Sequence, residues 1–187
     1  MRIEPTAIPG CFQLVPDIRA DERGSFVKTF REDLFREHGM ATTFAEEYYS
    51  LSRRNVVRGL HFQLPPHEHA KLVYCVQGAV LDAALDLRRG SPTYGQHLTF
   101  ELSAENGHML YLPAGLAHGF CTLGEQALMM YKVTSAYAPQ HDSGVRWDSA
   151  GIAWPDEVRR APLLSARDQG FATLAEFDSP FAYEAGA

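Results

Sequence analysis

KLVYCVQGAVLDAALDL, residues 71–87, contains two apolar, strand-forming runs on either side of Gly78. The pattern predicts strands at Lys71–Gln77 and Ala79–Leu87, the second of which is interrupted by Asp82 and Asp86. Further β-rich runs, separated by Gly, Pro and Asn, lie at Glu46–Arg53, His97–Leu102, His108–Leu112, Gly119–Leu123 and Ala127–Ser135. Many short strands at this spacing predict an all-β sandwich or barrel.

Helix signals are few. Glu32–His38 (EDLFREH) is amphipathic and ends before Gly39, which predicts one short helix, and the tail from Ser165 to Phe177 predicts one or two helical turns. A chain of 187 residues fits one compact domain. Within this single domain, 1–187, we expect an N-terminal arm (1–45), a barrel (46–147) and a C-terminal flap (148–187).

Composition and charge exclude several classes of protein. The net charge of −6 argues against a nucleic-acid-binding surface, and no apolar stretch is long enough to span a membrane. Pro and acidic residues occur too early in the chain for a signal peptide. Cys11, Cys75 and Cys121 are widely spaced and odd in number, so they imply no disulfide framework. We therefore expect a cytoplasmic protein.

The densest polar cluster is Arg58–Gln63 (RGLHFQ). If this run is a regular strand, His61 and Gln63 share one face with Gly59, which leaves room beside them. Arg58 would reach the same cavity only if the strand twists or ends there. The alternative interpretation is a histidine in the barrel wall that simply bonds a neighbour.

Three other segments carry polar groups that could complete a site. LPAGLAHGF (112–120) is a Pro-x-Gly turn followed by His118, which could aim that side chain inward. Tyr131 interrupts the apolar run around Met129–Lys132, and SARD (165–168) carries no meaning by itself. Metal-free proton transfer needs a base, an acid and a cation for an oxyanion, and His61, Tyr131 and Lys71 supply these three types.

A metal site is the competing interpretation. His67 and His69, with His118 further along the chain, have reasonable spacing for metal ligands. However, Lys71 would repel a divalent ion, and the segment around His67 is typical of an exposed loop. We therefore predict no bound metal.

The sequence resembles the nucleotide-sugar 3,5-epimerases, the dTDP-4-dehydrorhamnose 3,5-epimerase family. The resemblance rests on segments that follow one another in the family order over nearly the whole chain: DERGSF (21–26), VRGLHFQ (57–63), KLV (71–73), DLRRGSPTYG (86–95), LPAGLAHGF (112–120), YK (131–132) and GVRWD (144–148). Such a colinear set is more specific than any one motif.

The resemblance implies a fold, a reaction and a set of residues. The fold would be a cupin-type double-stranded β-helix, a jelly-roll barrel with a few short peripheral helices, in a homodimer that uses no metal or other cofactor. His61 would be the base, oriented by Asp168, and Tyr131 the acid, with Lys71 stabilising the enolate oxygen beside His118. Residues matched to substrate binding are Arg23, Phe26, Lys28, Glu46, Tyr48, Arg58, Gln63, His118, Tyr137 and Trp147.

The chain also departs from the family pattern. Glu46 and Tyr48 replace a Gln and an Asn that contact the ligand in the family, and Lys28 replaces an acid. Tyr137 and Trp147 could stack on the nucleotide base or pack between barrel and flap. These departures leave the substrate less defined than the reaction, so CDP-, GDP- or UDP-linked sugars and heptoses stay open.

The implied activity is epimerisation at C3 and C5 of a nucleotide-linked 4-keto-6-deoxy sugar. The alternatives are a 3-only or 5-only epimerase, a ketoisomerase, or a barrel that binds sugar nucleotides without catalysis.

Overall fold

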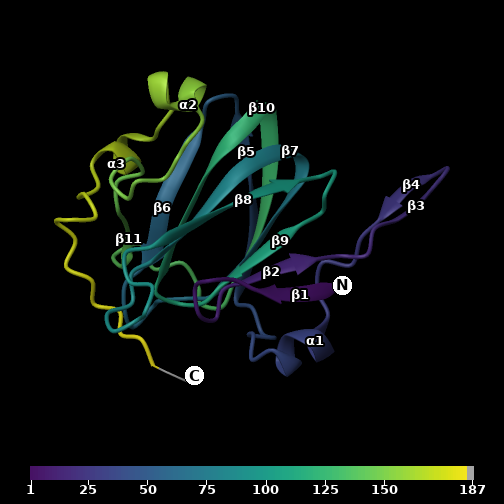
Figure 1. Ribbon diagram of the computed structural model, residues 1–187, viewed down its shortest axis with the longest axis horizontal. Coiled ribbons are helices and arrows are strands. Elements are labelled where there is room, and N and C mark those ends of the chain that lie inside the picture. The colour runs from purple at the N-terminus through teal and green to yellow at the C-terminus, as the bar shows by residue number, and fades with distance from the viewer. Residues whose placement is uncertain (185–187) are drawn as a thin grey trace.

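The computed structural model describes residues 1–184. One nine-stranded sheet runs in the order β1-β2-β9-β7-β10-β6-β11, with β5 paired to β10 and β8 paired to β7, and it curls into a barrel (Figure 1). The strands of this sheet are β1 (Arg2–Pro5), β2 (Phe12–Val15), β5 (Glu46–Arg53), β6 (Val57–Gln63), β7 (Lys71–Asp86), β8 (His97–Ser103), β9 (Met109–Leu112), β10 (Leu116–Val133) and β11 (Asp142–Gly144). A separate hairpin contains β3 (Arg19–Asp21) and β4 (Gly24–Phe26), and the helices are α1 (Glu32–Glu37), α2 (Asp156–Arg160) and α3 (Ala166–Gln169).

Two long, bent strands organise the barrel. The first half of β7 pairs with β9 and with the second half of β10, which also pairs with β5. The second half of β7 pairs with β8 and with the first half of β10, which also pairs with β6. Each long strand thus belongs to both faces of the barrel. With 44% strand and three short helices, the prediction of an all-β fold is confirmed.

The sequence led us to expect that a strand ends at Gly78, but it does not. Gly78 lies inside β7 at a positive φ of 74°, where a Cβ atom would come within 2.0 Å of the carbonyl oxygen of Gln126. The register between β7 and β10 shifts close to this point, between Leu123 and Leu128. The two strands predicted on either side of Gly78 are therefore one bent strand, β7. The two predicted at Gly119–Leu123 and Ala127–Ser135 likewise belong to one bent strand, β10.

Apolar side chains fill the barrel and cover both of its outer faces. The interior cluster includes Val73, Phe120 and Met129. On one outer face, α1 and the first strands pack through Phe35 and Leu14 against β7 and β9. On the other face, segments after β11 pack against β6 and β7 in a cluster that contains Leu60, Phe62, Trp147, Trp154, Val158 and Phe181.

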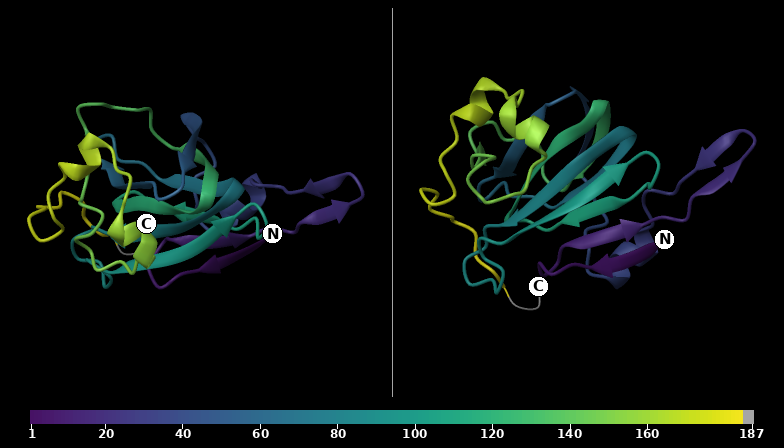
Figure 2. Two further views of the ribbon diagram at one scale, coloured as in Figure 1. Left: turned by 90° about the horizontal axis from the view of Figure 1, so that it is seen from above. Right: turned by 45° about the horizontal axis from the view of Figure 1, so that its top comes forward.

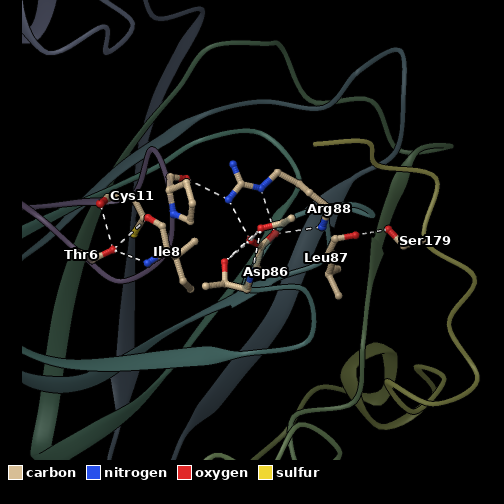
Figure 3. Close-up of polar contacts among 10 residues, drawn as sticks. Thr6, Ile8, Cys11, Asp86, Leu87, Arg88 and Ser179 are labelled. Carbon is tan, nitrogen blue, oxygen red and sulfur yellow. Dashed lines mark hydrogen bonds and ion pairs between the residues drawn. The ribbon is translucent and has the colours of Figure 1, made fainter. Parts of the chain in front are cut away.

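A buried polar network joins both ends of the chain to β7 (Figure 3). Arg88 donates from Nε and Nη2 to the two carboxylate oxygens of Asp86, each at 2.9 Å, and Nη2 also reaches the carbonyl of Pro9. Ser179 donates to the carbonyl of Leu87. Because a buried carboxylate must be paired, this network fixes the N-terminal and C-terminal segments on the same end of the barrel.

The terminal segments differ in part from the expected arm and flap. β1 pairs with β2, which pairs with β9, so both extend the sheet, whereas the β3–β4 hairpin projects away from it (Figure 2). Helix α1 lies where the EDLFREH segment predicted a helix, and α3 lies in the predicted helical tail, but no sequence signal led us to α2. No helix within residues 1–184 is long and apolar enough to cross a membrane.

Candidate active site

A cavity of about 500 Å³ opens on the inner side of the barrel, lined by residues from β5, β6, β7 and β10 and from the segments that follow β10. Nine of the residues predicted for the site line this cavity: Glu46, Tyr48, Arg58, His61, Gln63, Lys71, His118, Tyr131 and Tyr137. The barrel therefore brings together most of the chemistry-bearing side chains that the sequence scatters over about ninety residues.

A bulge in β6 explains why Arg58 and His61 face the same cavity. His118 pairs with His61 and Phe120 pairs with Arg58, so β10 advances two residues while β6 advances three. The extra residue reverses the alternation of side chains along β6. Gly59 occupies the irregular position at a φ of 121°, a conformation that favours glycine. The regular strand assumed from the sequence places Arg58 on the wrong face.

His61 and Asp168 form a pair at the cavity wall. Nε2 of His61 lies 2.9 Å from Oδ1 of Asp168, whose Oδ2 accepts the backbone N–H of Gly59 at 3.1 Å. Burial lowers the pKa of His61, and the hydrogen bond to Asp168 opposes that effect. Burial alone would raise the pKa of Asp168, but the hydrogen bonds it accepts hold this pKa at about 2. The carboxylate is therefore charged at neutral pH and beside a neutral imidazole.

Asp168 is placed by the short helix α3, which packs against β6 (Figure 1). The hydroxyl of Ser165, the N-cap of α3, accepts the backbone N–H of Asp168 at 3.0 Å. The SARD segment thus has a local reason to fold as a single turn.

Lys71 is a buried cation beside His61. Its Nζ donates to the backbone carbonyl of His61 at 3.0 Å, and its side chain is 6% exposed as part of β7. Burial lowers the pKa of Lys71 to about 8, while the charges of Asp142 and Asp82 oppose that shift. A cation held this way can stabilise an oxyanion that forms in the cavity.

Tyr131 is buried on β10 and carries two partners from β5. Its hydroxyl lies 3.0 Å from the hydroxyl of Ser50, and the ring of Tyr48 stacks on its ring at 4.8 Å and 17°. Burial raises the pKa of Tyr131, so the phenol keeps its proton at neutral pH. A neutral phenol in a cavity can act as a proton donor.

His118 contacts a second buried carboxylate. Its Nε2 lies 2.8 Å from Oδ2 of Asp82, and both side chains are almost inaccessible. Burial raises the pKa of Asp82, whose Oδ1 has no hydrogen-bond partner within the described residues. Asp82 is the residue that interrupts the apolar strand in the sequence, and its polarity was the available signal for this pair.

The remaining predicted residues at the cavity contact the backbone. Glu46 Oε1 accepts the N–H of Tyr137 at 2.9 Å. The amide of Gln63 donates to the carbonyl of His67 at 2.8 Å and accepts the N–H of Ala138 at 2.6 Å. Gln63 therefore ties two loops together at the mouth of the cavity.

Four predicted binding residues lie elsewhere. Arg23, Phe26 and Lys28 belong to or follow the β3–β4 hairpin and do not line the cavity. Trp147 is 8% exposed, its ring centroid lies 6.3 Å from that of Trp154, and it does not line the cavity. Its backbone carbonyl accepts the indole N–H of Trp154, which fixes the flap on the barrel.

Sequence reasoning missed several lining residues. Ser50, Ser135, Asp142 and Arg167 contribute polar groups to the cavity. Arg167 precedes Asp168 in the SARD segment, and proximity to that residue was the only signal for it. Serines and acidic residues are too common in a sequence for the other three to stand out.

The histidines considered as metal ligands are used separately. His69 lies 3.2 Å from the amide of Gln63, His67 packs on His141, and His118 pairs with Asp82. Within residues 1–184, no group of three or more His, Cys, Asp or Glu side chains converges in a way that could hold a metal ion.

Comparison with known proteins places this cavity in a known family. The family model described as dTDP-4-dehydrorhamnose 3,5-epimerase matches residues 5–176. The chain is 43% identical over 171 residues to the dTDP-4-dehydrorhamnose 3,5-epimerase of Salmonella typhimurium, covering 90% of this chain and 92% of that one. The chain belongs to the dTDP-4-dehydrorhamnose 3,5-epimerase family. The prediction of a carbohydrate epimerase is thereby confirmed.

The family shares its barrel as well as its sequence. A dTDP-6-deoxy-D-glucose-3,5-epimerase from Legionella pneumophila, solved in complex with dTDP-4-keto-L-rhamnose, superposes with a TM-score of 0.92 at 34% identity and covers 98% of this chain and 99% of its own. Structures of this family are cupin-like β-barrels, which confirms the predicted fold. The chain is also 40% identical over 179 residues to a dTDP-4-dehydrorhamnose 3-epimerase of Streptomyces niveus, covering 94% of this chain and 85% of that one.

Proposed function

We propose that this epimerase inverts C3 and C5 of a dTDP-linked 4-keto-6-deoxy sugar, converting dTDP-4-dehydro-6-deoxyglucose to dTDP-4-dehydrorhamnose. The observation that carries the proposal is one cavity whose walls hold His61 backed by Asp168, together with Lys71 and Tyr131. Family membership supplies the substrate class, and the side chains supply the proton-transfer chemistry.

The C4 ketone of such a sugar acidifies the C–H bonds at C3 and C5. His61 takes one of these protons, and Asp168 holds the imidazole and stabilises the imidazolium that forms. Lys71 stabilises the enolate oxygen at C4, and His118 lines the same cavity. Tyr131 then returns a proton to the opposite face of the carbon. A general base of this kind contributes on the order of 10²–10⁴-fold to a rate.

On this proposal Arg58 holds the diphosphate. Its Nε donates to the hydroxyl of Ser52 at 2.9 Å and its Nη2 to the carbonyl of Leu51 at 3.3 Å, and the side chain lines the cavity. Tyr137 at the mouth is 59% exposed, so its ring can stack on the nucleotide base. Glu46 lies beside it and accepts the N–H of Tyr137, where it can contact the nucleotide or sugar.

Two features support a homodimer. Tyr49, Leu51 and Val76 alternate with residues that face the barrel interior, and they are 67%, 53% and 47% exposed on the outer face of β5 and β7. An apolar patch of this kind on a sheet marks an interface. The β3–β4 hairpin projects beyond it (Figure 2). For Arg23, Phe26 and Lys28 to contact substrate, they must reach the cavity of a second copy.

A cytoplasmic location is part of the proposal. All three cysteines are free and buried, which fits a reducing compartment.

A deuterium-exchange experiment tests the proposal. dTDP-, CDP-, GDP- and UDP-linked 4-keto-6-deoxy sugars are incubated with the protein in deuterated water and followed by proton NMR. We expect deuterium at both C3 and C5 of the dTDP sugar, and loss of exchange in His61→Asn. Exchange at one carbon alone identifies a mono-epimerase, the activity named for the Streptomyces niveus relative. Absence of exchange in every sugar contradicts the proposal.

A further inference from the structure

Nε2 of His61 has two neighbours that cannot both bond it. Oδ1 of Asp168 lies 2.9 Å away and can only accept, because the carboxylate is charged. Nη2 of Arg167 lies 3.0 Å away and can only donate. A protonated Nε2 therefore bonds Asp168, and an unprotonated Nε2 bonds Arg167. The two contacts correspond to the two neutral tautomers of His61.

The two tautomers differ in their ability to act as a base. With the proton on Nε2, the lone pair of Nδ1 is free to accept a proton from a substrate. With Nε2 bonded to Arg167, the proton sits on Nδ1 and the nitrogen left for the substrate has no lone pair. Arg167 must therefore leave Nε2 before His61 can remove a proton.

Arg167 has two other anionic partners and a half-exposed side chain. Its Nε lies 3.5 Å from Oδ1 of Asp168. Its Nη1 pairs with the carboxylate of Asp142, which also accepts the hydroxyl of Tyr137 at 3.2 Å, and its guanidinium lies over the ring of Phe171 at 5.6 Å. The Arg167 side chain is 47% exposed, whereas that of Asp168 is 3% exposed. The carboxylate is thus fixed and the cation is the mobile partner of His61.

Arg167 also lines the cavity, as do the cations Arg58 and Lys71. Lys71 is held by the carbonyl of His61, and Arg58 is held by Ser52. An anionic group that enters this cavity competes with Asp142, with Asp168 and with the neutral Nε2 for Arg167. A diphosphate is the stronger acceptor, because it offers several charged oxygens to the guanidinium fork.

We propose that Arg167 is a positioning residue that selects the tautomer of His61 and gives up Nε2 to Asp168 when a diphosphate enters the cavity. In the free protein, Arg167 competes with Asp168 for Nε2 and so raises the share of the tautomer that cannot act as a base. The ligand draws Arg167 away, and Asp168 then stabilises the tautomer that can. Only the choice of a nucleotide diphosphate as ligand rests on the proposed function.

Nitrogen-15 NMR of the histidine rings tests the proposal directly, because protonated and unprotonated ring nitrogens have well-separated shifts. The protein is labelled at histidine and measured at mildly alkaline pH, and His61 is assigned by comparison with His61→Gln. Wild type, Arg167→Met and Arg146→Met are measured free and with saturating dTDP, whose binding is followed by calorimetry. Met keeps an unbranched side chain but cannot donate. Arg146 pairs with Asp148 outside the cavity and serves as the matched control.

In free wild type and in Arg146→Met, we expect a measurable share of the tautomer protonated on Nδ1, and dTDP is expected to move that proton to Nε2. In Arg167→Met, we expect the proton on Nε2 with or without dTDP. The proposal is overturned if free wild type and Arg167→Met show the same tautomer, or if bound dTDP leaves the wild-type tautomer unchanged. Failure of dTDP to bind contradicts the proposed function instead, and the comparison of the free proteins still decides the role of Arg167.

Discussion

At the scale of single residues, burial and one partner together decide what each group can do. His61 and Lys71 are both desolvated, which weakens their hold on protons, but only His61 has a carboxylate in direct contact. Lys71 donates to a backbone carbonyl, so no neighbouring anion fully offsets its burial. His61 therefore changes its charge below pH 7, and Lys71 changes its charge above pH 7.

The pH dependence of kcat/KM follows from these two groups. Catalysis needs neutral His61 and cationic Lys71. Because burial lowers the pKa of His61 below the ~6.5 of a free imidazole, activity is lost as the pH falls through that lower pKa. Because burial lowers the pKa of Lys71 to about 8, activity is lost as the pH rises through about 8. A bell-shaped profile is expected. In Lys71→Arg the alkaline fall should disappear from the measurable range, and its persistence there would exclude Lys71 as its cause.

Tyr48 is expected to affect the rate at which Tyr131 donates a proton, rather than to donate a proton itself. Its ring stacks on Tyr131, and an aromatic pair is worth about 0.5–1.5 kcal/mol. Tyr48→Ala should reduce the rate of deuterium delivery at the centre served by Tyr131 by up to roughly tenfold, while Tyr48→Phe keeps the stack and the rate. Rates at C3 and C5 are read separately by NMR. Equal rates in wild type and Tyr48→Ala would show that the stack is only packing.

The sequence predicts site residues where a polar group breaks an apolar pattern. His61, His118 and Tyr131 stand out in this way, as Asp82 does, and all four lie at or directly behind the cavity. Asp142 and Arg167 belong to the short elements β11 and α3, which are too short to show a periodic pattern, so only the fold reveals these residues. The assigned roles of His61, Tyr131, Lys71 and Asp168 stay predictions until they are measured.

At the scale of elements, the close backbone contact between the paired strands β6 and β10 shapes the site. Gly59 and Gly119 face each other, and a Cβ on Gly59 would lie 2.6 Å from the Cα of Gly119 and 2.8 Å from the carbonyl oxygen of His118. These are backbone atoms that cannot move aside. The pairing of β6 with β10 holds His61 and His118 opposite each other. No strand periodicity reveals such a contact, because it joins residues sixty positions apart.

Gly59→Ala is expected to destabilise the protein by about 3–4 kcal/mol, from a strained positive φ and from overpacking against β10. Gly90→Ala is the matched control, since Gly90 also has a positive φ of 84° but nothing within 4 Å of its Cβ position. That control should cost about 1–2 kcal/mol. Urea unfolding gives both free energies of unfolding. Similar losses in the two variants would mean that φ strain alone matters at Gly59.

Strand boundaries illustrate what pattern alone can give. The predicted bounds of Glu46–Arg53 match those of β5, which pairs with β10. Gly78 and Gly124 resemble turns in the sequence, but in the barrel Gly78 lets β7 bend while its hydrogen bonds continue on either side. Curvature of a sheet depends on tertiary pairing, so the sequence yields the runs but not their continuity.

At the scale of the whole molecule, the β3–β4 hairpin projects away from the barrel (Figure 2), and none of its residues lines the cavity. Arg23 pairs with Asp21 at the hairpin tip, and Phe26 is 59% exposed. A cation and an aromatic ring presented on a projecting hairpin suit a diphosphate and a base in a neighbouring copy. On this proposal each site is built from two chains.

Shared sites predict complementation between two inactive variants. His61→Asn lacks the base but keeps its hairpin, and the double variant Arg23→Ala, Phe26→Ala lacks the hairpin contacts but keeps its base. Each homodimer should be nearly inactive. Refolded together in equal amounts, half of the dimers are mixed, and each mixed dimer holds one complete site. Deuterium exchange should therefore recover to about a quarter of the wild-type rate. If the mixture shows only the mean of the two separate rates, the hairpin serves its own chain or none.

Light scattering on the same samples checks that both variants remain dimers. Tyr49→Glu with Leu51→Glu should abolish both the dimer and the recovery, because it places charges on the apolar face of β5.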